Sequence, residues 1–320
     1  MRRAGAVAAV LLVTLVVGAW LATPVAAGRP ELSGTVQVSG AWAMYPMMVR
    51  WASEFMKVHP KVEVDVSGGG AGKGAADALG GLVDIGMISR AIRPEETAKG
   101  GWWVPVVKDA VVPTANAANP AAKDLAAKGM TQAQFTALWI EGKQMTWGEI
   151  VGKPQIKVPV RTYTRADACG AADVWALYLG KKKQEDLKGL GVNNDPGVAE
   201  AVKRDKSGIG YNNAGYAYDP KTGRPVQGLM VIPIDTNGNG KVDKEESFYA
   251  TRTSVAKAIA DGRFPSPPAR DLNLLTRGKP KGATAEFIRW ILTDGQKYVQ
   301  PEGFILLPKA KLQAGLKALR

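Results

Sequence analysis

The chain has 320 residues and a formal net charge of +13, so it is too long for one small core and about the right length for two domains. Its basic residues are dispersed, without an arginine-rich run, and we therefore expect anionic ligands and no nucleic-acid partner. The single cysteine, Cys169, excludes an internal disulfide, which leaves packed cores and a bound ion to stabilise the fold.

The first residues have the pattern of an export signal. Arg2 and Arg3 precede an apolar run, Ala4–Leu21, and the small residues of Thr23–Ala27 suit cleavage after Ala27. A membrane anchor is the alternative, because the run is near the lower length limit for a spanning helix. The cleavage sequence favours removal, so we expect a signal peptide over residues 1–27 and a periplasmic or extracellular protein.

Short apolar strands then alternate with helices. The expected strands are Thr35–Ser39, Val62–Ser67 and Asp84–Ser89, and the helices between them are Pro46–Val58 and Gly72–Leu82. This alternation is typical of a mostly parallel α/β sheet.

A second α/β unit follows the Asn- and Pro-rich stretch Pro113–Pro120, which we expect to carry the first passage between two lobes. The stretch Phe264–Arg270 is expected to carry the return. The sequence therefore predicts a two-lobed α/β fold with mixed, mostly parallel sheets and a hinge, in which residues 28–115 with 269–320 form lobe 1 and residues 116–268 form lobe 2. The remaining expected elements are the strands Val104–Val112, Val158–Thr164, Gly208–Tyr211 and Asp271–Thr276 and the helices Thr131–Glu141, Cys169–Leu179 and Thr284–Thr293.

Three of the expected strands run into a helix start through small residues, at Ser39–Ala43, Ser67–Gly74 and Arg165–Ala171. Helix amino ends carry unpaired N–H groups and a partial positive charge, so several of them in one cleft bind an anion without a catalytic group. Arg165 can hold an oxyanion through two N–H groups while Asp167 fixes its guanidinium. The alternative for this pair is an ordinary surface ion pair.

Cys169 lies at the third helix start and is a candidate nucleophile, because a helix amino end lowers the pKa of a thiol. The chain has one histidine, His59, and none near Cys169 in the sequence, so the activating base of a Cys/His enzyme is lacking. We expect a packed thiol and no enzymatic activity.

Residues 235–246, DTNGNGKVDKEE, match a twelve-residue calcium loop with glycine at the sharp turn. A glycine-rich surface turn is the alternative. Because no second loop or paired helices accompany it, we expect a structural calcium ion rather than a calcium switch. The expected ligands are Asp235, Asn237, Asn239, the carbonyl of Lys241, Asp243 through a water molecule, and Glu246.

Several motifs together carry a family resemblance. They are SGAWAMYPMMVRWASEF (39–55), VSGGGAGKGAADALGGLVDIGMISR (66–90), YTRADACGAADVW (163–175), MTWGEIVG (145–152), SGIGYNNAGY (207–216) and AEFIRWILTDGQKYVQPEGFILLP (285–308). In their order and spacing they resemble the phosphate-binding proteins that deliver phosphate to bacterial ABC transporters. The resemblance implies the two-lobed periplasmic-binding-protein fold, type II-like, a phosphate ligand, an ABC permease as partner and a monomer.

Serine and threonine hydroxyls hold the ligand in that family, and this chain lacks several of them. Ser89 is kept, but Ile88 replaces a frequent hydroxyl residue. The positions that the resemblance places at the ligand are Ala41, Trp42, Ala43, Ala71, Lys73, Ser89, Arg90, Arg165, Asp167, Cys169, Gly170 and Ala171.

Three accounts of the site therefore stay open. Phosphate, the ligand we favour, is bound through Arg165, Lys73 and backbone N–H groups; or another small oxyanion has replaced it; or the pocket is vestigial on a scaffold for protein contacts. An inward-pointing Trp42 would favour the second or third account, because an indole fills space or stacks on a flat ligand.

Overall fold

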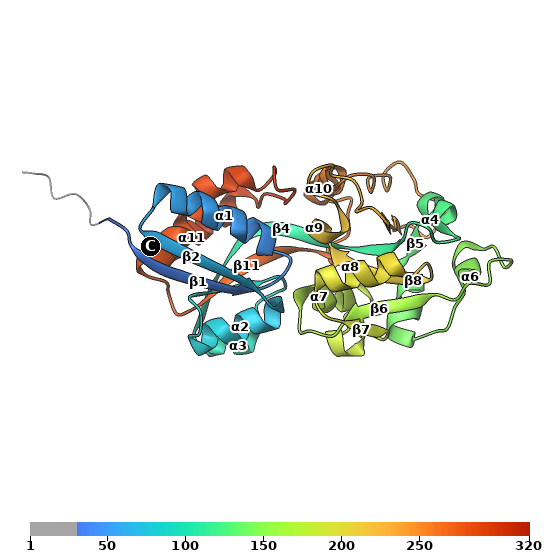
Figure 1. Ribbon diagram of the computed structural model, residues 1–320, viewed down its shortest axis with the longest axis horizontal. Coiled ribbons are helices and arrows are strands. Elements are labelled where there is room, and N and C mark those ends of the chain that lie inside the picture. The colour runs from blue at the N-terminus through green and yellow to red at the C-terminus, as the bar shows by residue number, and fades with distance from the viewer. Residues whose placement is uncertain (1–30) are drawn as a thin grey trace, which may run out of the picture. The chain divides into compact units, whose positions relative to one another are not determined.

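The structure, a computed structural model, describes residues 31–320 (Figure 1). The expected signal peptide, residues 1–27, lies outside the described residues. Within the described part, no helix combines the length and apolar character needed to cross a membrane. The fold is built around one mixed sheet of nine strands with helices packed along it, and this confirms the predicted α/β class.

The first lobe begins with three parallel strands, β1 (Gly34–Gly40), β2 (Val62–Gly68) and β3 (Ile85–Ile88). The helices α1 (Tyr45–Val58) and α2 (Gly70–Gly80) connect them, as predicted to within about two residues at each end. Pro46 lies in the first turn of α1, where its missing N–H costs no hydrogen bond. Small residues let α2 approach the sheet closely, since a Cβ on Gly74 would lie 2.8 Å from the Cα of Gly40.

One long strand, β4 (Gly101–Asn116), runs from the first lobe into the second, and β11 (Ala269–Arg277) pairs with its first-lobe part. β4 pairs antiparallel with β11 as far as Ala110, and from Val111 onward it pairs antiparallel with β8 (Gly208–Asn213) of the second lobe. The change of partner comes before the expected passage at Pro113–Pro120. Pro113 belongs to the strand, and its carbonyl accepts a hydrogen bond from Ile232 N–H at 2.9 Å, so the residue that indicated a loop is accommodated in the sheet.

The second lobe repeats the parallel arrangement, with β6 (Arg161–Arg165) between β8 and β7 (Leu190–Val192). The antiparallel pairs of the large sheet lie around β4 and its partner β11. The other elements of the chain are α3 (Pro94–Ala98), α4 (Ala122–Lys128), β5 (Met130–Thr131), α5 (Gln132–Thr136), a π-helical turn (Ala137–Glu141), α6 (Trp147–Val151), α7 (Gly170–Tyr178), a 3-10 turn (Gln184–Asp186), α8 (Asp195–Arg204), α9 (Ala214–Ala217), β9 (Leu229–Val231), β10 (Ile234–Asp235), α10 (Arg252–Ala260), α11 (Gly282–Leu292), a 3-10 turn (Asp294–Tyr298) and α12 (Lys309–Leu319).

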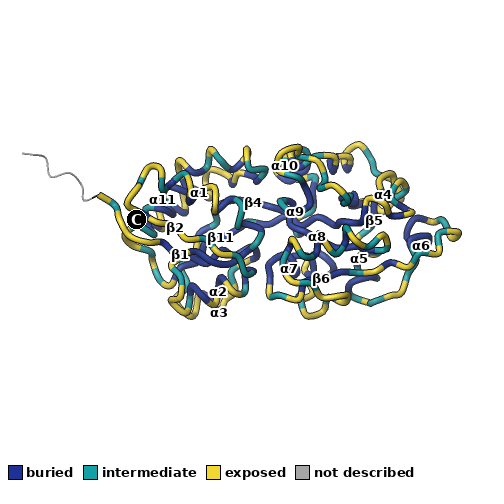
Figure 2. Tube along the Cα trace, viewed as in Figure 1, coloured by how far each residue is buried: buried dark blue, intermediate teal, exposed yellow. Residues whose placement is uncertain are grey.

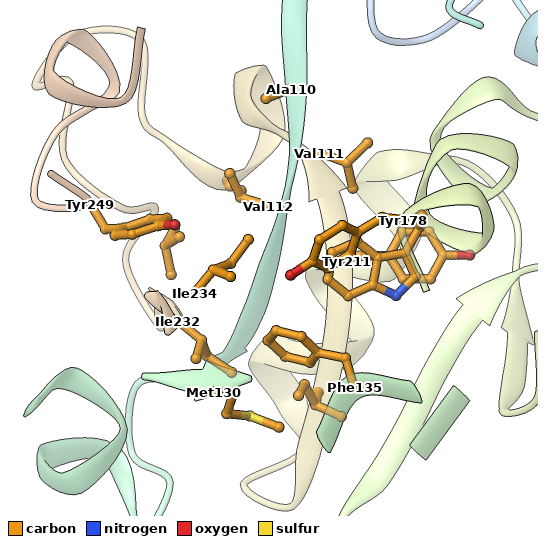
Figure 3. Close-up of a cluster of buried hydrophobic side chains, with 14 of the residues drawn as sticks. Ala110, Val111, Val112, Met130, Phe135, Tyr178, Tyr211, Ile232, Ile234 and Tyr249 are labelled. Atoms are coloured by element: carbon orange, nitrogen blue, oxygen red, sulfur yellow. The ribbon is translucent and has the colours of Figure 1, made fainter. Parts of the chain in front are cut away.

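Each lobe has its own apolar core, and buried segments run through both (Figure 2). Trp51, Phe55 and Phe287 are fully buried in the first core, and Trp139 and Trp175 are fully buried in the second. β4 is covered on both faces where it enters the second lobe. Figure 3 shows Val111 on the side of Tyr211 and Tyr178, and Val112 on the opposite side with Ile234 and Tyr249. This burial holds the middle of β4 between side chains of the second-lobe core.

Candidate functional site

The three helix starts predicted from the sequence meet at the boundary between the lobes. The Gly72 N–H of α2 donates to the Ala168 carbonyl before α7 at 3.1 Å. A Cβ on Gly170, the first residue of α7, would lie 2.4 Å from Ser89 Oγ at the end of β3. Only glycine permits this approach, so the sequence places the starts of α2 and α7 and the end of β3 against one another.

These helix starts present backbone donors without partners. Within residues 31–320, no acceptor is bonded to the N–H groups of Trp42 and Ala43 before α1, Ala71 in α2, or Gly170 and Ala171 in α7. Orphan N–H groups at a helix amino end are satisfied by water or by an anion. Ala41 is excluded from this set, because its N–H donates to the Met87 carbonyl at 2.9 Å.

Arg165 is buried at the end of β6 and bonds two carboxylates. Its Nε lies 2.7 Å from Asp167 Oδ1 and its Nη1 lies 2.5 Å from Asp195 Oδ2, while Nη2 bonds the second oxygen of Asp167. Burial opposes the charge of Arg165, but Asp195 and Asp167 outweigh it and raise the pKa above its usual range. Asp167 therefore holds the Arg165 guanidinium as predicted. The alternative, a surface ion pair, is excluded because the Arg165 side chain is 1% exposed.

Asp195 is the residue that sequence reasoning missed. It is fully buried in the first turn of α8, and its Oδ1 accepts hydrogen bonds from the Asn213 backbone N–H and Nδ2, each at 2.9 Å. The sequence at Asn194-Asp195-Pro196 indicates only a helix start, and nothing in it points to an arginine thirty residues earlier. Together Arg165, Asp167 and Asp195 have a formal charge of −1. An oxyanion at this place is thus attracted by N–H donors rather than by net charge, and Arg165 keeps one uncommitted N–H on each terminal nitrogen.

Cys169 is the N-cap of α7, where its Sγ accepts the Ala172 N–H at 3.4 Å. Burial raises the pKa of this thiol to about 12, which outweighs the opposite effect of Arg165. The thiol is therefore protonated at neutral pH and is unsuited to nucleophilic attack.

Two of the expected cationic ligands are occupied by other partners. Lys73 Nζ bonds Asp77, which also accepts Ser39 Oγ at 2.6 Å, so Lys73 is held within its own helix. Arg90 forms a bidentate ion pair with Glu96, and its Nε lies 3.2 Å from Oδ2 of Asp173 in α7. Arg90 therefore forms a contact between the two lobes and does not take part in the anion site with the unpartnered N–H donors.

Trp42 lines the first-lobe wall of the site. Its indole covers Gly68, where a Cβ would lie 2.5 Å from the ring, and its ring centroid is 5.6 Å from that of Tyr45. The Trp42 carbonyl accepts a hydrogen bond from Tyr216 of the second lobe at 3.1 Å. Tyr216 ends the motif SGIGYNNAGY, but it was not among the expected site residues.

The predicted calcium loop has both of its end carboxylates buried. Asp235 accepts the N–H groups of Gly238 and Gly240 at 2.7 and 2.9 Å, and Glu246 accepts the N–H of Thr236 at 2.7 Å. Asp243 accepts the side-chain amides of the two loop asparagines. No group of three or more His, Cys, Asp or Glu side chains in residues 31–320 is placed to hold a metal ion. Calcium binding stays a prediction.

Comparison with known proteins agrees with the resemblance seen in the motifs. The phosphate-binding protein PstS of Bacillus subtilis is 27% identical over 240 residues, which are 74% of this chain and 75% of the relative. The phosphate-binding protein PstS of Methanocaldococcus jannaschii is 26% identical over 351 residues, covering 90% of this chain and 87% of the relative.

Solved structures show the same fold at low identity. A phosphate ABC transporter substrate-binding protein with bound phosphate from Clostridium perfringens superposes with a TM-score of 0.69 and 22% identity, covering 86% of this chain and all of the other. An ABC-type phosphate transport receptor from Vibrio cholerae gives a TM-score of 0.59 and 18% identity, with 86% of this chain and all of the other covered. The family model for the PBP superfamily domain matches residues 25–295. With two core-bearing lobes, a strand that crosses between them and this match over most of its length, the chain belongs to the PBP superfamily.

Proposed function

We propose that the protein is an exported solute-binding protein that captures a small oxyanion, with phosphate as the favoured ligand, and delivers it to an ABC permease. The observation that carries the proposal is the meeting of three helix starts, with free N–H groups, beside Arg165 at the lobe boundary. The names of the relatives support phosphate as the ligand. No group in this site has the chemistry of a catalyst, so we propose binding without turnover.

The missing hydroxyls set the expected strength of binding. Each hydrogen bond to a charged group contributes about 1.5–3 kcal/mol, so a site with alanines at 41, 43 and 71 is expected to bind phosphate more weakly than a hydroxyl-lined one. Ser89 supplies the hydroxyl at the junction of β3 and α7, where Gly170 lies against it. Backbone N–H groups and Arg165 supply the remaining donors.

The test is calorimetric titration of residues 28–320, dialysed free of anions, with phosphate and then with sulfate. Ser89→Ala is expected to weaken phosphate binding about tenfold through the loss of one donor. Ser67→Ala is the matched control, because Ser67 Oγ bonds the Val38 carbonyl in the same lobe. Heat with sulfate but none with phosphate would show that the ligand is an oxyanion other than phosphate. No heat with either anion would favour the account in which the protein is a scaffold for protein contacts.

Two observations favour that scaffold account. The Gly72 N–H already has an acceptor from the other lobe, and Arg165 is neutralised by two carboxylates, so part of the binding capacity is satisfied by the protein itself. A protein that binds no small anion but elutes as a complex with an extracytoplasmic partner would support a scaffold over a transport receptor.

We also propose that the loop 235–246 holds a structural calcium ion. Asp235 and Glu246 are buried at the two ends of the loop, and Gly240 has the φ of +75° that the sharp turn requires. Chelation is expected to lower the melting temperature by several degrees, because a ligand that binds only the folded state stabilises it. Asp235→Asn keeps an acceptor for the loop N–H groups but removes the charge, and is expected to abolish the calcium response. An equal response to calcium in Asp235→Asn would show that the ion binds elsewhere.

A further inference from the structure

A pocket lies at the end of the first lobe that faces away from the lobe boundary. The strand β3 begins at Ile85, while its neighbours β1 and β11 extend past this point to Gly34 and Arg277, so the sheet has a notch there. The end of α2 lines the notch from one side of the sheet and the start of α11 lines it from the other (Figure 1). The pocket has a volume of about 540 Å³, which is in the range of small-molecule sites.

Three cations line this pocket. They are Arg277, Lys279 and Lys281, which alternate with glycine and proline in the segment RGKPKG (277–282). None of the three side chains forms an ion pair or a hydrogen bond within residues 31–320. Like charges that gather at one place without partners repel one another, and a bound anion relieves this repulsion.

The segment that carries the cations is held in place by its backbone. Thr276 Oγ1 donates to the Gly278 carbonyl at 2.7 Å, and the Gly278 N–H donates to the Gly100 carbonyl at 2.7 Å. Arg277 lies against the end of α2, where a Cβ on Gly81 would be 3.4 Å from its Nη1. The negative end of the α2 dipole accounts for the position of this arginine, but not for the two lysines that follow it.

Other groups of the pocket are neutral or acidic. The Gln37 N–H donates to Asp84 Oδ2 at 2.8 Å, which leaves Asp84 Oδ1 without a hydrogen bond in the described part of the chain. The side-chain amide of Gln37 and the hydroxyl of Thr284 also line the pocket. A carboxylate accepts hydrogen bonds and repels a bare anion, so the part of a ligand beside Asp84 must carry hydroxyl donors.

We propose that this pocket binds a phosphate ester that carries hydroxyl groups, such as glycerol phosphate. The phosphate group contacts Arg277, Lys279 and Lys281, and the hydroxyl groups bond Asp84 and Gln37. The carboxyl ends of the parallel strands lead to the helix-start site, whereas this pocket lies at their other end, so the two sites are separate. The proposal therefore holds whether or not the helix-start site binds phosphate.

The experiment is calorimetric titration of residues 28–320 with glycerol 3-phosphate at low ionic strength, where screening of exposed charges is weak. We expect a dissociation constant of about 1 mM or tighter for the wild type. Lys279→Gln combined with Lys281→Gln is expected to bind at least about tenfold more weakly. Both lysines are exposed, so the double variant is expected to fold.

The matched control is Lys309→Gln combined with Lys317→Gln, which removes the same charge from exposed positions of α12. This control and Ser89→Ala, which alters the helix-start site, are both expected to bind glycerol 3-phosphate as the wild type does. Equal weakening in the two double-lysine variants would show a general effect of net charge. Loss of binding in Ser89→Ala would show that the ester binds at the helix starts. Either result, or no heat with the wild type, would overturn the proposal.

Methyl phosphate tests the hydroxyl contacts, because it has the phosphate group without the hydroxyl groups. It is expected to bind several-fold more weakly than glycerol 3-phosphate, and equal affinity would overturn the contacts assigned to Asp84 and Gln37.

Vesicles of phosphatidylglycerol distinguish a lipid headgroup from a free ester as the source of this chemistry. If the wild type sediments with the vesicles and the Lys279→Gln, Lys281→Gln variant does not, the ligand is the headgroup. If the wild type binds glycerol 3-phosphate but does not sediment with the vesicles, the ligand is a free ester. Both results support the pocket.

Discussion

Arg165 and Asp195 show how a functional side chain becomes part of the fold. Asp195 is fully buried and its Oδ2 bonds Arg165, so each charge depends on the other for its stability. Asp167 adds a second carboxylate, and its pKa is lowered because hydrogen bonds from Arg165 outweigh the effect of burial. The group that we propose for anion binding therefore cannot be removed without consequences for folding.

We expect Arg165→Ala to lower the free energy of unfolding by about 3–5 kcal/mol, because Asp195 becomes an unpaired buried charge. Adding Asp195→Asn to Arg165→Ala is expected to restore part of this loss. Urea unfolding of the two single variants and the double variant measures the coupling. Independent, additive losses would contradict the buried pair. For binding studies, Ser89→Ala is thus a cleaner probe than Arg165→Ala.

Glu96 gives a pH-dependent prediction. Burial raises the pKa of Glu96, but hydrogen bonds from Arg90 and the Arg93 N–H outweigh it and hold the pKa below its usual range. A lowered folded pKa means that the stabilisation is complete above the unfolded pKa of about 4.3 and is lost as pH falls through the folded value.

Glu96→Gln is therefore expected to cost about 1.5–3 kcal/mol at pH 7, and the difference from wild type is expected to shrink below about pH 4. Urea unfolding at pH 7 and pH 3 measures it. Glu95→Gln, one residue earlier and exposed, is the control and should cost little at either pH. A difference that is the same at both pH values would mean that the charge of Glu96 is not the stabilising group.

At the scale of elements, contact between the lobes depends on glycines in α2. A Cβ on Gly72 would lie 2.7 Å from the Ala168 Cβ, which comes from the second lobe. Gly80, in the last turn of the same helix, meets only Leu82 Cγ at 3.9 Å. Alanine at Gly72 and alanine at Gly80 are thus the same substitution in one helix. Only Gly72 has a neighbour across the lobe boundary.

Gly72→Ala is expected to weaken phosphate binding at least about tenfold, because closure then leaves α2 and Ala168 too close. Gly80→Ala is expected to bind as the wild type does. Titration calorimetry of both variants provides the comparison, and circular dichroism checks that α2 is intact. Equal affinities for the two variants would show that ligand capture does not need this contact.

At the scale of the whole molecule, Asp173 of α7 links the lobes through two arginines of the first lobe. Its Oδ2 lies 3.2 Å from Arg90 Nε and 2.9 Å from Arg93 Nη2. Opening the lobes separates these groups, while Asp261 and Arg263 in the second lobe stay together.

Asp173→Asn is expected to release bound phosphate several-fold faster, because two charge-assisted contacts between the lobes are lost. Stopped-flow dissociation measures the rate, and small-angle scattering should show a larger mean radius of gyration. Asp261→Asn removes a comparable surface charge within one lobe and should leave both values unchanged. Identical dissociation rates for Asp173→Asn and the wild type would exclude Asp173 from the closing contacts.

The sequence was informative where structure is local. The amphipathic pattern after Pro46 predicted α1, and small residues before Gly170 predicted α7, because the relevant hydrogen bonds lie within a few residues. Other parts depend on contacts far along the chain. Asp195 pairs with Arg165 over 30 residues and Tyr216 with Trp42 over 174. Thr131–Glu141 was predicted as one helix, and it is α5 followed directly by a π-helical turn.

β4 belongs to both lobes as one unbroken strand, and this constrains how the molecule moves. A loop hinge swings freely, but β4 is held by a ladder to β11 on one side of Ala110 and to β8 beyond it. Separating the lobes therefore requires twisting β4 together with the strands bonded to it, and the resistance increases with the angle between the lobes. β4 therefore resists bending elastically. The angle to which the lobes open and the rate at which they close again are set in part by this strand, independently of which anion is bound.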